Sequence, residues 1–572
     1  MEARLSDTPT LSWQTRTIPQ GAPEALAKGH HLPSLVANVL AARGWTPGQE
    51  LAAFLGERTP TVPDALDLVG VPVAATRLWQ AIDAGEPITV CGDYDVDGVT
   101  GAALLVAVLR AAGAQVDTFL PHRYHGGYGL NTAALDDLAG RGTKVLVTVD
   151  NGTSSIAELQ YARDLGMDAI VTDHHLPGPE LPDVVAIVNP RLMAEPGPFD
   201  PLAGVGVAYQ LMRGLAALRP ERTDLPAIVE RQVDLVAIGT IGDMAPLSGE
   251  NRRLVRLGLS MIARTPRLGI ALLAKSVKAS LDAAETIAHR LIPRLNAAGR
   301  MANAGLALDL LLAEDEGTAR ALVEKLDQLN RQRRVLTEAT EARCIDLLRR
   351  DKQPAVALHE AGWHHGVTGI VAARMAERFG KPALLFAPDG DNWRGSGRSV
   401  PGFDLHAVLD ELADHLVRYG GHAAAVGVTV ADDKLEGFIK AFQACVARRR
   451  AGEPTGPRGW EVDLEVPLEA LTLPDVQGLA CLEPTGMHNP VPRLAARGLK
   501  VVRQGTRGPQ GQHLWLELAG DEGGPTLEAI GFNMGSLHPV GDRVDAVFTP
   551  VAERWHGKQR LQLKLAAIGA LA

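Results

Sequence analysis

The chain has few cysteines and no long apolar segment. Only four of its 572 residues are cysteine, and Cys91, Cys344, Cys445 and Cys481 lie far apart without a CxxC pair. This spacing excludes a disulfide framework and a thiolate zinc site, and it fits a reducing compartment. No apolar run reaches the length of a membrane span, and the N-terminus lacks the basic-then-apolar layout of a signal peptide. We therefore expect a cytoplasmic protein that does not enter a membrane.

An excess of basic residues is also absent. The formal net charge is −10, which by itself argues against a phosphate-rich partner, because lysine and arginine drive nucleic-acid binding by releasing counterions. Carboxylates that neutralise bound metals also count as negative, however. The basic clusters at 331–334 and 448–450 either line a local channel or form solvated helix faces. Hydrophobic residues make up 46% of the chain, as in an ordinary globular protein, and the length allows three or four domains.

Carboxylates follow an apolar, strand-like run at residues 88–92. The run continues into Asp93, Asp95, Asp97 and Gly98, after which a helix is expected over 99–112. Residues i and i+2 of an extended chain point the same way, so Asp95 and Asp97 can present both carboxylates to one cluster. Gly98 permits a tight turn into the helix. The spacing therefore predicts a place to hold a metal ion.

Three more apolar runs end on residues that can bind a metal. Residues 144–150 end on Asp150, residues 168–175 end on Asp173, His174 and His175, and residues 234–243 end on Asp243. Strands alternating with helical stretches predict a parallel sheet, at whose carboxyl ends ligands gather. A single Asp after a strand is more often a turn former or helix cap. The four segments together, with oxygen and imidazole donors, favour a site for Mn2+ or Mg2+.

The rest of the chain divides by composition. Residues 1–70 read as a helical lead-in with no chemistry of its own, and 71–313 carry the acidic cluster. Residues 318–350 contain no glycine or proline and predict one helix of about nine turns, within a connecting segment over 314–350. A second α/β region is expected over 351–451. Short alternating runs over 460–572 predict a small barrel or sandwich. The expected fold class is α/β, with two α/β domains joined by a long helix and a C-terminal all-β domain.

Ordered motifs along the chain carry a family resemblance. They are GDYDVDG (92–98), PHR (121–123), GYGL (127–130), VDNG (149–152), DHH (173–175), GDMAPL (242–247), PRLNAAGRM (293–301), GWHHGVTGIVA (362–372), GSGRS (395–399) and GGH (420–422). In this order they resemble the DHH phosphoesterase superfamily and, within it, the RecJ family of single-strand-specific 5′-to-3′ DNA exonucleases. The resemblance covers nearly the whole chain. It implies a DHHA1 domain in the second α/β region and an OB-fold in the C-terminal domain.

The resemblance also implies roles for individual residues. It makes Asp95, Asp97, Asp150, His174 and Asp243 metal ligands, with Asp150 bridging two Mn2+ or Mg2+ ions and Asp93 and His175 assisting. Two such ions roughly 3.5–4 Å apart activate a water and neutralise charge on the leaving oxygen. Phosphates of the substrate would be held by Arg123, Arg294, Asn296, Ser396, Arg398 and His422.

Two places depart from the family pattern: Cys91 beside the acidic cluster, and the segment before the barrel, which has Thr485 where an aromatic residue is usual and His488 where glycine is usual. Wider relatives place a histidine four residues before the first ligand aspartate, where this chain has Cys91. Cys91 is either a soft ligand or a small core residue, and a free cysteine packs like a small hydrophobe. In the C-terminal domain, Trp515 and Trp555 are either platforms for stacked bases or core residues.

The implied activity is release of 5′-mononucleotides from single-stranded DNA in repair and recombination. Implied partners are single-stranded DNA, a single-strand-binding protein and a helicase, and the chain is expected to be a monomer. One alternative is a DHH/DHHA1 phosphodiesterase of short oligoribonucleotides or cyclic dinucleotides, which lacks the C-terminal barrel. A second is an inert nucleic-acid-binding scaffold, which would have gaps in its acidic set. A third is a manganese-dependent pyrophosphatase, which should be shorter.

Overall fold

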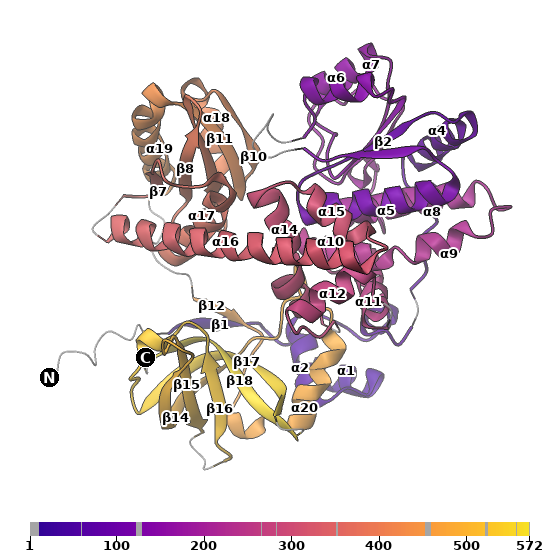
Figure 1. The fold of residues 1–572 in the computed structure, drawn as a ribbon. Helices are drawn as coiled ribbons and strands as arrows, with labels where there is room; N and C mark the ends of the chain where they lie inside the picture. The colour runs from indigo at the N-terminus through magenta and orange to yellow at the C-terminus, as the bar shows by residue number, and fades with distance from the viewer. Residues whose placement is uncertain are drawn as a thin grey trace. The chain divides into compact units, whose positions relative to one another are not determined.

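The computed structural model describes residues 11–58, 60–121, 129–264, 266–281, 283–349, 353–451, 459–520, 524–555 and 558–570. The chain forms two compact units. The larger unit contains Pro63–Ala245 and Leu254–Pro457, and the smaller contains Met1–Val62, Pro246–Arg253 and Arg458–Ala572. Figure 1 shows the helices and strands of both. Each unit is described by itself below.

The first α/β region of the larger unit is built on a five-stranded sheet in the order β3-β2-β4-β5-β6, and every neighbouring pair is parallel. Helices α6 and α7 lie on one side of this sheet and α5 and α8 on the other (Figure 1). The elements are α4 (Val71–Ala84), β2 (Ile88–Gly92), α5 (Val96–Ala112), β3 (Val116–Phe119), α6 (Thr132–Gly140), β4 (Val145–Val149), α7 (Ile156–Asp164), β5 (Asp168–Thr172), β6 (Ala186–Val188), α8 (Gly204–Ala217), α9 (Leu225–Glu230) and α10 (Val233–Gly242). The predicted parallel sheet is confirmed.

One predicted strand is wrong. The run before Asp243 is the helix α10 (Val233–Gly242), not a strand. Its residues are apolar on every face and nearly all buried, and a fully buried run has no alternation that separates strand from helix. Its glycines allow close packing on α5, since a Cβ at Gly242 would lie 2.0 Å from Val96 Cγ1. Asp243 therefore comes to the site from the end of a helix.

The start of α5 also differs from the prediction. The helix begins at Val96 rather than at 99, because Asp95 acts as its N-cap and accepts hydrogen bonds from the backbone N–H groups of Asp97 (2.9 Å) and Gly98 (3.3 Å). Asp97 thus lies in the first helical turn, and the extended-chain argument for Asp95 and Asp97 does not hold. The aspartate pattern that signals a metal site is also a helix-capping pattern.

A long helix links the two α/β regions. The elements from residue 268 onward are α12 (Leu268–Ser276), α13 (Ala284–Thr286), a π-helical turn (Ile287–Leu291), α14 (Ile292–Met301), α15 (Gly305–Leu312) and α16 (Glu316–Leu348). Helix α16 has 33 residues, and the Asp315 side chain caps it by accepting from the N–H of Thr318 at 2.7 Å. This confirms the predicted connecting helix.

The second α/β region has a mixed sheet in the order β10-β11-β9-β8-β7, in which only β7 and β8 are parallel. Its elements are β7 (Val356–His359), α17 (His365–Phe379), β8 (Ala383–Asp389), β9 (Asn392–Arg398), α18 (Leu405–Glu411), β10 (Arg418–His422), β11 (Ala425–Ala431) and α19 (Leu435–Arg449). Phe386, Phe438 and Phe442 are fully buried in its core. The region therefore has a hydrophobic core of its own.

The smaller unit contains a closed β-barrel. Strands pair in the order β14-β15-β16-β18-β17, and β14 also pairs with β17, which closes the barrel. The elements of this unit are β1 (Trp13–Thr15), α1 (Ala22–His30), α2 (Ser34–Ala42), α3 (Gln49–Leu55), β12 (Trp460–Val462), β13 (Leu464–Glu465), α20 (Leu473–Gly478), β14 (Leu494–Arg507), β15 (His513–Ala519), β16 (Leu527–Gly531), β17 (Arg543–Trp555) and β18 (Lys558–Gly569). The predicted C-terminal barrel is confirmed.

The N-terminal helices are part of the barrel's core, which the sequence did not indicate. Leu26 and Leu40 are fully buried in one cluster with Phe548 and Leu563 of the barrel. Strand β1 pairs in parallel with β12, so that Trp13 lies opposite Trp460. The Arg43 guanidinium donates to Asp463 (2.9 and 3.0 Å) in a pair that is almost completely buried. The lead-in is thus a structural component of the smaller unit.

Among the described residues, no single helix combines the length and apolar character needed to cross a membrane. One sharply bent pair, α11 (Gly249–Arg264) with α12, meets those criteria of length and composition only when its two helices are taken together.

Candidate metal centre

Acidic side chains and two histidines gather at the carboxyl ends of the three central strands of the parallel sheet. Asp93 and Asp95 follow β2, Asp150 follows β4, and Asp173, His174 and His175 follow β5. Asp97 comes from the first turn of α5, and Asp243 directly follows α10. Parallel strands bring their carboxyl ends to one edge of the sheet, which explains why segments far apart in sequence meet there.

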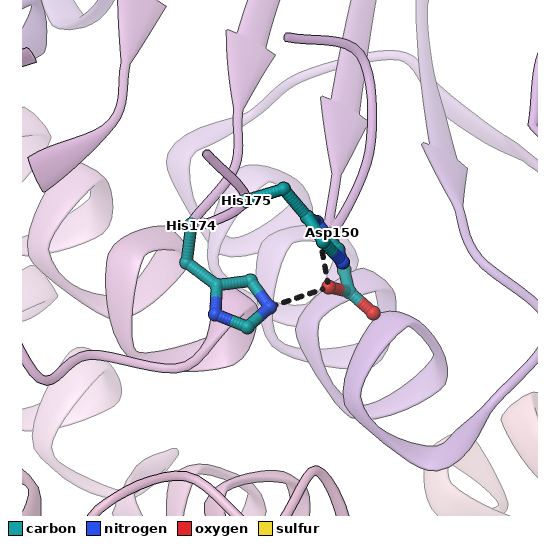
Figure 2. A group of neighbouring side chains, drawn as sticks. All are labelled: Asp150, His174 and His175. Carbon is teal, nitrogen blue, oxygen red and sulfur yellow. Dashed lines mark hydrogen bonds and ion pairs between the residues drawn. The ribbon is translucent and has the colours of Figure 1, made fainter. Parts of the chain in front are cut away.

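Asp150 lies near both histidines of this group. His174 Nε2 lies 3.0 Å and His175 Nδ1 lies 3.9 Å from the same oxygen, Asp150 Oδ1 (Figure 2). The backbone of Asp150 has φ 63, in the left-handed region that Asp and Asn tolerate better than other non-glycine residues. Gly204 leaves room for it, since a Cβ there would lie 2.7 Å from Asp150 Cβ.

Asp97 is fully buried and held by the start of α8. Its carboxylate accepts the N–H groups of Gly204 (2.7 Å) and Val205 (2.9 Å). Its Oδ2 lies 3.9 Å from His174 Nε2, and the other ring nitrogen of His174 lies 3.9 Å from Asp243 Oδ2. His174 therefore stands between Asp97, Asp150 and Asp243.

The side chains form three overlapping groups that could each hold a metal ion. They are Asp150 with His174 and His175, Asp97 with His174 and Asp243, and Asp93 with Asp95 and Asp150; in each, the ligand atoms lie within 4.8 Å of one another. All five residues predicted as ligands belong to these groups, as do the predicted helpers Asp93 and His175. Asp150 and His174 each belong to two groups, so one connected site contains all seven side chains.

The carboxylates repel one another. Burial raises the pKa of Asp97 well above its ordinary value, and the charges of Asp243 and Asp95 raise it further. Burial and the charges of Asp97 and Asp95 do the same to Asp150. Burial and Asp95 raise the pKa of Asp243 to about 6. Ionised carboxylates packed in this way destabilise a protein unless cations neutralise them.

The donor set fits a divalent cation such as Mn2+ or Mg2+. Carboxylate oxygens are the preferred ligands of such ions, and imidazole is also accepted by Mn2+. Burial lowers the pKa of His174 to about 4, with a further contribution from His175. His174 is therefore neutral at pH 7, and a nitrogen lone pair is available for a metal. Within the described residues no cysteine belongs to these groups.

Cys91 is a core residue. It is buried in β2 and packs in one apolar cluster with Leu130, Leu146 and Val171. Burial raises the pKa of its thiol, with a smaller contribution from Asp117, and a thiol kept protonated is a poor metal ligand. Of the two interpretations of Cys91, the structure supports the core residue.

Asp173 holds the segment of the two histidines in place, a role that the sequence analysis did not predict. Its Oδ1 accepts a hydrogen bond from His175 Nδ1 at 2.7 Å and from the N–H of His174 at 2.8 Å, and its Oδ2 accepts from the N–H of Thr153 at 3.0 Å. Burial opposes ionisation, yet the bond to Asp173 raises the pKa of His175 to about 9, and the pKa of Asp173 lies well below its usual range. The sequence signal is the carboxylate directly before the two histidines, a pairing that orients imidazole rings.

Two of the predicted phosphate holders have protein partners. Arg294 Nε donates to Asp327 of α16 at 2.6 Å, and its Nη1 donates to the carbonyl of Arg290 at 2.6 Å. The side-chain oxygen of Asn296 accepts the N–H of Val96 at 2.9 Å. Both residues sit on α14, and the structure brings Asn296, not Arg294, into contact with the segment that carries Asp95 and Asp97.

The other predicted phosphate holders come mainly from the second α/β region. Ser396 and Arg398 are neighbours on one face of β9, and Thr368 of α17 donates to the Ser396 hydroxyl at 3.3 Å. The His422 ring stacks on the His175 ring with centroids 6.2 Å apart and an interplanar angle of 19°. His422 thus connects this region to the acidic cluster. Arg123 lies outside the described residues.

Family models match three parts of the chain. They are the DHH family, N-terminal domain over residues 87–240, the DHHA1 domain over 352–448 and the RecJ OB domain over 462–567. The first match contains the strands that bear the acidic cluster, except for Asp243 at its far end. The second contains β9 and β10, and the third contains the barrel.

Curated relatives and solved structures match nearly the whole chain. The single-stranded-DNA-specific exonuclease RecJ of Bacillus subtilis is 34% identical over 564 residues, covering 97% of this chain and 70% of the relative. The protein of the same name from Escherichia coli is 36% identical, covering 88% of this chain and 89% of the relative. The crystal structure of RecJ in complex with Mn2+ from Thermus thermophilus has a TM-score of 0.83 and 32% identity, covering 98% of this chain and 80% of that one. A Mg2+ complex of RecJ from the same organism has a TM-score of 0.78. The chain belongs to the RecJ family.

Proposed function

We propose that this chain is a metal-dependent exonuclease that degrades single-stranded DNA from the 5′ end and releases 5′-mononucleotides, in DNA repair and recombination. The observation that carries the proposal is the connected site of five carboxylates and two histidines at one edge of the parallel sheet. Relatives that are at least 34% identical over most of the chain bear the name single-stranded-DNA-specific exonuclease. The barrel of the smaller unit supports a nucleic-acid substrate rather than a small phosphate ester.

Two Mn2+ or Mg2+ ions would be held by Asp95, Asp97, Asp150, His174 and Asp243. Such a pair supplies an activated water for in-line attack on phosphorus and neutralises charge on the leaving oxygen. Asp150 and His174 each belong to two of the three groups, and Asp150 is the better candidate for a shared ligand because a carboxylate has two oxygens whereas a neutral imidazole has one nitrogen lone pair. Asp93 would complete the set, and His175, whose Nδ1 donates to Asp173, would support it.

The chain's own contacts hold these side chains before substrate arrives. The N–H groups of Gly204 and Val205 fix the carboxylate of Asp97. Asp173 accepts a hydrogen bond from the Nδ1–H group of His175, which leaves Nε2 as the ring nitrogen that can donate to a phosphate oxygen of the strand. Loss of a hydrogen bond that orients a metal ligand typically lowers metal affinity or activity by about 10–100-fold.

The terminal 5′-phosphate would be held by the second α/β region. Ser396 and Arg398 share one face of β9, and a guanidinium fork matches phosphate oxygens bidentately. His422, stacked on His175, would sit between the held phosphate and the metal site. Arg123 and Arg294 remain candidates for further phosphate contacts. An enzyme that begins at one end needs a pocket for that end, and this set would supply it.

The barrel would bind the strand beyond the reacting end. Trp515 supports this less than its sequence position suggested, because its side chain is mostly buried and its indole N–H donates to Glu528 at 3.0 Å. Arg503 and Arg507 lie over its ring, at 5.5 and 4.2 Å from the centroid, and these arginines are the better candidates for contacts to the strand. The Trp555 side chain lies outside the described residues.

The proposed division of labour follows the domains expected from the sequence, with catalysis in 71–313 and 351–451 and strand binding in 460–572. The expected partners are a single-strand-binding protein and a helicase that exposes single strands. The protein would act as a monomer in the cytoplasm.

Purified protein with Mn2+ and end-labelled DNA tests the proposal. A 5′-labelled single strand should release its label at once as a mononucleotide, a 3′-labelled strand should shorten progressively, and a duplex of the same sequence should resist. EDTA should stop all hydrolysis. Release of the 3′ label first, or faster cleavage of a short oligoribonucleotide or a cyclic dinucleotide than of the DNA strand, would contradict the proposal.

A further inference from the structure

Helix α14 contacts the start of α5 across a long sequence separation. The side-chain oxygen of Asn296 accepts the backbone N–H of Val96 at 2.9 Å. Val96 lies between Asp95 and Asp97, and it is buried. Asp95 itself accepts the next two N–H groups, those of Asp97 and Gly98. The first N–H groups of α5, which no helix can satisfy internally, are therefore satisfied by two side chains, one of them from α14.

A second contact on the same face of α14 reaches the same segment. Gly299 is three residues after Asn296 and so lies on the same side of the helix. A Cβ at Gly299 would lie 2.2 Å from the Tyr94 carbonyl oxygen, so the backbone of α14 sits directly against residue 94. At the end of the helix, Arg300 Nη1 donates to the carbonyl of Gly366 in α17 at 3.3 Å. Helix α14 therefore touches both the segment that carries Asp95 and Asp97 and the start of α17.

The direction of the Asn296 hydrogen bond decides which part of its amide is engaged. Val96 N–H is a donor, so the Asn296 atom facing it must be the oxygen. A phosphate has only acceptor oxygens, and Asn296 could hold one only through its NH2 group. The contact in the structure engages the oxygen, which fixes the amide against the start of α5, and the NH2 group takes no part in this bond.

We propose that Asn296 is a positioning residue for the metal centre: through its side-chain oxygen it fixes Val96, and through Val96 the carboxylates of Asp95 and Asp97, a role that does not need its NH2 group. This inference rests on the proposed metal-dependent hydrolysis. Without the Asn296 oxygen, the Val96 N–H has no partner in a buried place, and the first turn of α5 must shift or fray. Metal sites depend on ligand positions within a few tenths of an ångström, so a shifted turn would weaken metal binding directly.

Two substitutions at Asn296 separate the two roles. Asn296→Ala removes the acceptor, whereas Asn296→Asp keeps an oxygen that can accept from Val96 but has no NH2 group for a phosphate. Calorimetric titration of Mn2+ into the full chain without DNA gives the metal affinity. Steady-state hydrolysis of a 5′-phosphorylated single strand at saturating Mn2+ gives kcat and KM.

The positioning role predicts about tenfold or greater loss of Mn2+ affinity and a lower kcat in Asn296→Ala, with KM for the strand little changed. Asn296→Asp should bind Mn2+ about as tightly as the unaltered chain. Unchanged Mn2+ affinity in Asn296→Ala, or a raised KM in both variants with normal Mn2+ affinity, would overturn the proposal. If Asn296→Ala does not fold, Asn296→Asp still decides, because tenfold weaker Mn2+ binding in that variant contradicts the positioning role.

Asp404→Ala is the matched control. Asp404 caps α18 by accepting the N–H of Ala407 at 3.0 Å, so its loss removes the same kind of bond in the second α/β region. Its melting temperature should fall about as much as that of Asn296→Ala while its Mn2+ affinity stays unchanged. Equal loss of Mn2+ affinity in both variants would show general destabilisation and refute the inference. Failure of the unaltered chain to bind Mn2+ or cut DNA would instead refute the proposed function.

Discussion

The two α/β regions of the larger unit hold opposite kinds of charge. In the first, Asp97 in the opening turn of α5 and Asp150 after β4 are buried where carboxylates from several segments converge. In the second, Ser396 and Arg398 lie on an antiparallel strand and are partly exposed. A nuclease must hold cations and phosphates at once, and under the proposed function each task would belong to a different sheet.

The glycines of β9 determine on which face of the strand Ser396 and Arg398 lie. Side chains alternate along a strand, so Gly395 and Gly397 share the face opposite Ser396 and Arg398. A Cβ at Gly395 would lie 2.5 Å from Phe386 Cε1, and one at Gly397 would lie 2.5 Å from Val426 Cγ2. The inner face has no room for side chains, so the strand packs tightly on the core. Ser396 and Arg398 are thereby held on the other face, toward α17, where a Cβ at Gly369 would be 3.5 Å from both.

The largest expected effect comes from a substitution in the acidic cluster of the first α/β region. Asp150→Asn should reduce hydrolysis in Mn2+ to no more than a few per cent of the normal rate, because a neutral amide cannot neutralise two metal ions. Asparagine is preferred to alanine because the residue has φ 63 and Asn tolerates that conformation. The rate is measured with a 5′-labelled single strand. A substantial remaining rate would mean that Asp150 is not the shared ligand.

Arg398→Ala tests the proposed binding of the terminal 5′-phosphate by the second α/β region. Charge-assisted hydrogen bonds contribute about 1.5–3 kcal/mol, so binding of 5′-phosphorylated strands should weaken roughly ten- to hundredfold, and binding of 5′-hydroxyl strands far less. Fluorescence anisotropy in an Asp150→Asn background avoids hydrolysis during the measurement. Metal affinity should not change. Equal losses on both strands would show that Arg398 holds an internal phosphate.

Arg294→Ala tests the competing candidate in the same experiment. Arg294 is paired with Asp327 at 2.6 Å and with the carbonyl of Arg290, so its removal should affect stability more than discrimination between the two strand ends. If Arg294→Ala removes the preference for a 5′-phosphate and Arg398→Ala does not, the end-binding role belongs to α14 rather than to β9.

A smaller effect is expected from Asp173→Asn. The amide keeps one acceptor but loses the charge that holds His175, whose Nδ1 lies 2.7 Å from Asp173. About a tenfold loss of rate is expected, as is typical when a residue that hydrogen-bonds to a metal-site side chain is substituted. The Mn2+ concentration for half-maximal rate should rise as well. An unchanged rate and metal requirement would reduce Asp173 to a turn-forming residue.

The sequence predicted the convergence of the acidic residues but not all the elements that carry them. The rule that ligands gather at the carboxyl ends of parallel strands needs only the alternation of strands and helices, so Asp95, Asp150 and His174 were placed correctly. Asp243 joined the site although its run is a helix, because a buried apolar run of ten residues fits either structure.

Contacts between distant segments could not be predicted. The resemblance implied that Asn296 holds a phosphate, whereas its partner in the structure, Val96, is 200 residues away in the sequence. The same applies to the N-terminal lead-in, since Leu26 and Leu40 needed an apolar partner and the sequence does not name the barrel residues Phe548 and Leu563 as that partner. Pairings of this kind depend on the whole packed core rather than on local pattern.

Melting temperatures of the unaltered chain and of Asp150→Asn, in EDTA and in Mn2+, test the claim that the acidic cluster is a metal centre most directly. Mn2+ that binds only the folded chain should stabilise it by about 2.7 kcal/mol when free Mn2+ is a hundredfold above Kd. The account predicts a clear rise in the melting temperature of the unaltered chain with Mn2+. In EDTA, Asp150→Asn should melt higher than the unaltered chain because one repelling charge is gone, and it should gain less from Mn2+. A melting temperature of the unaltered chain that is the same in EDTA and in Mn2+ would contradict the account.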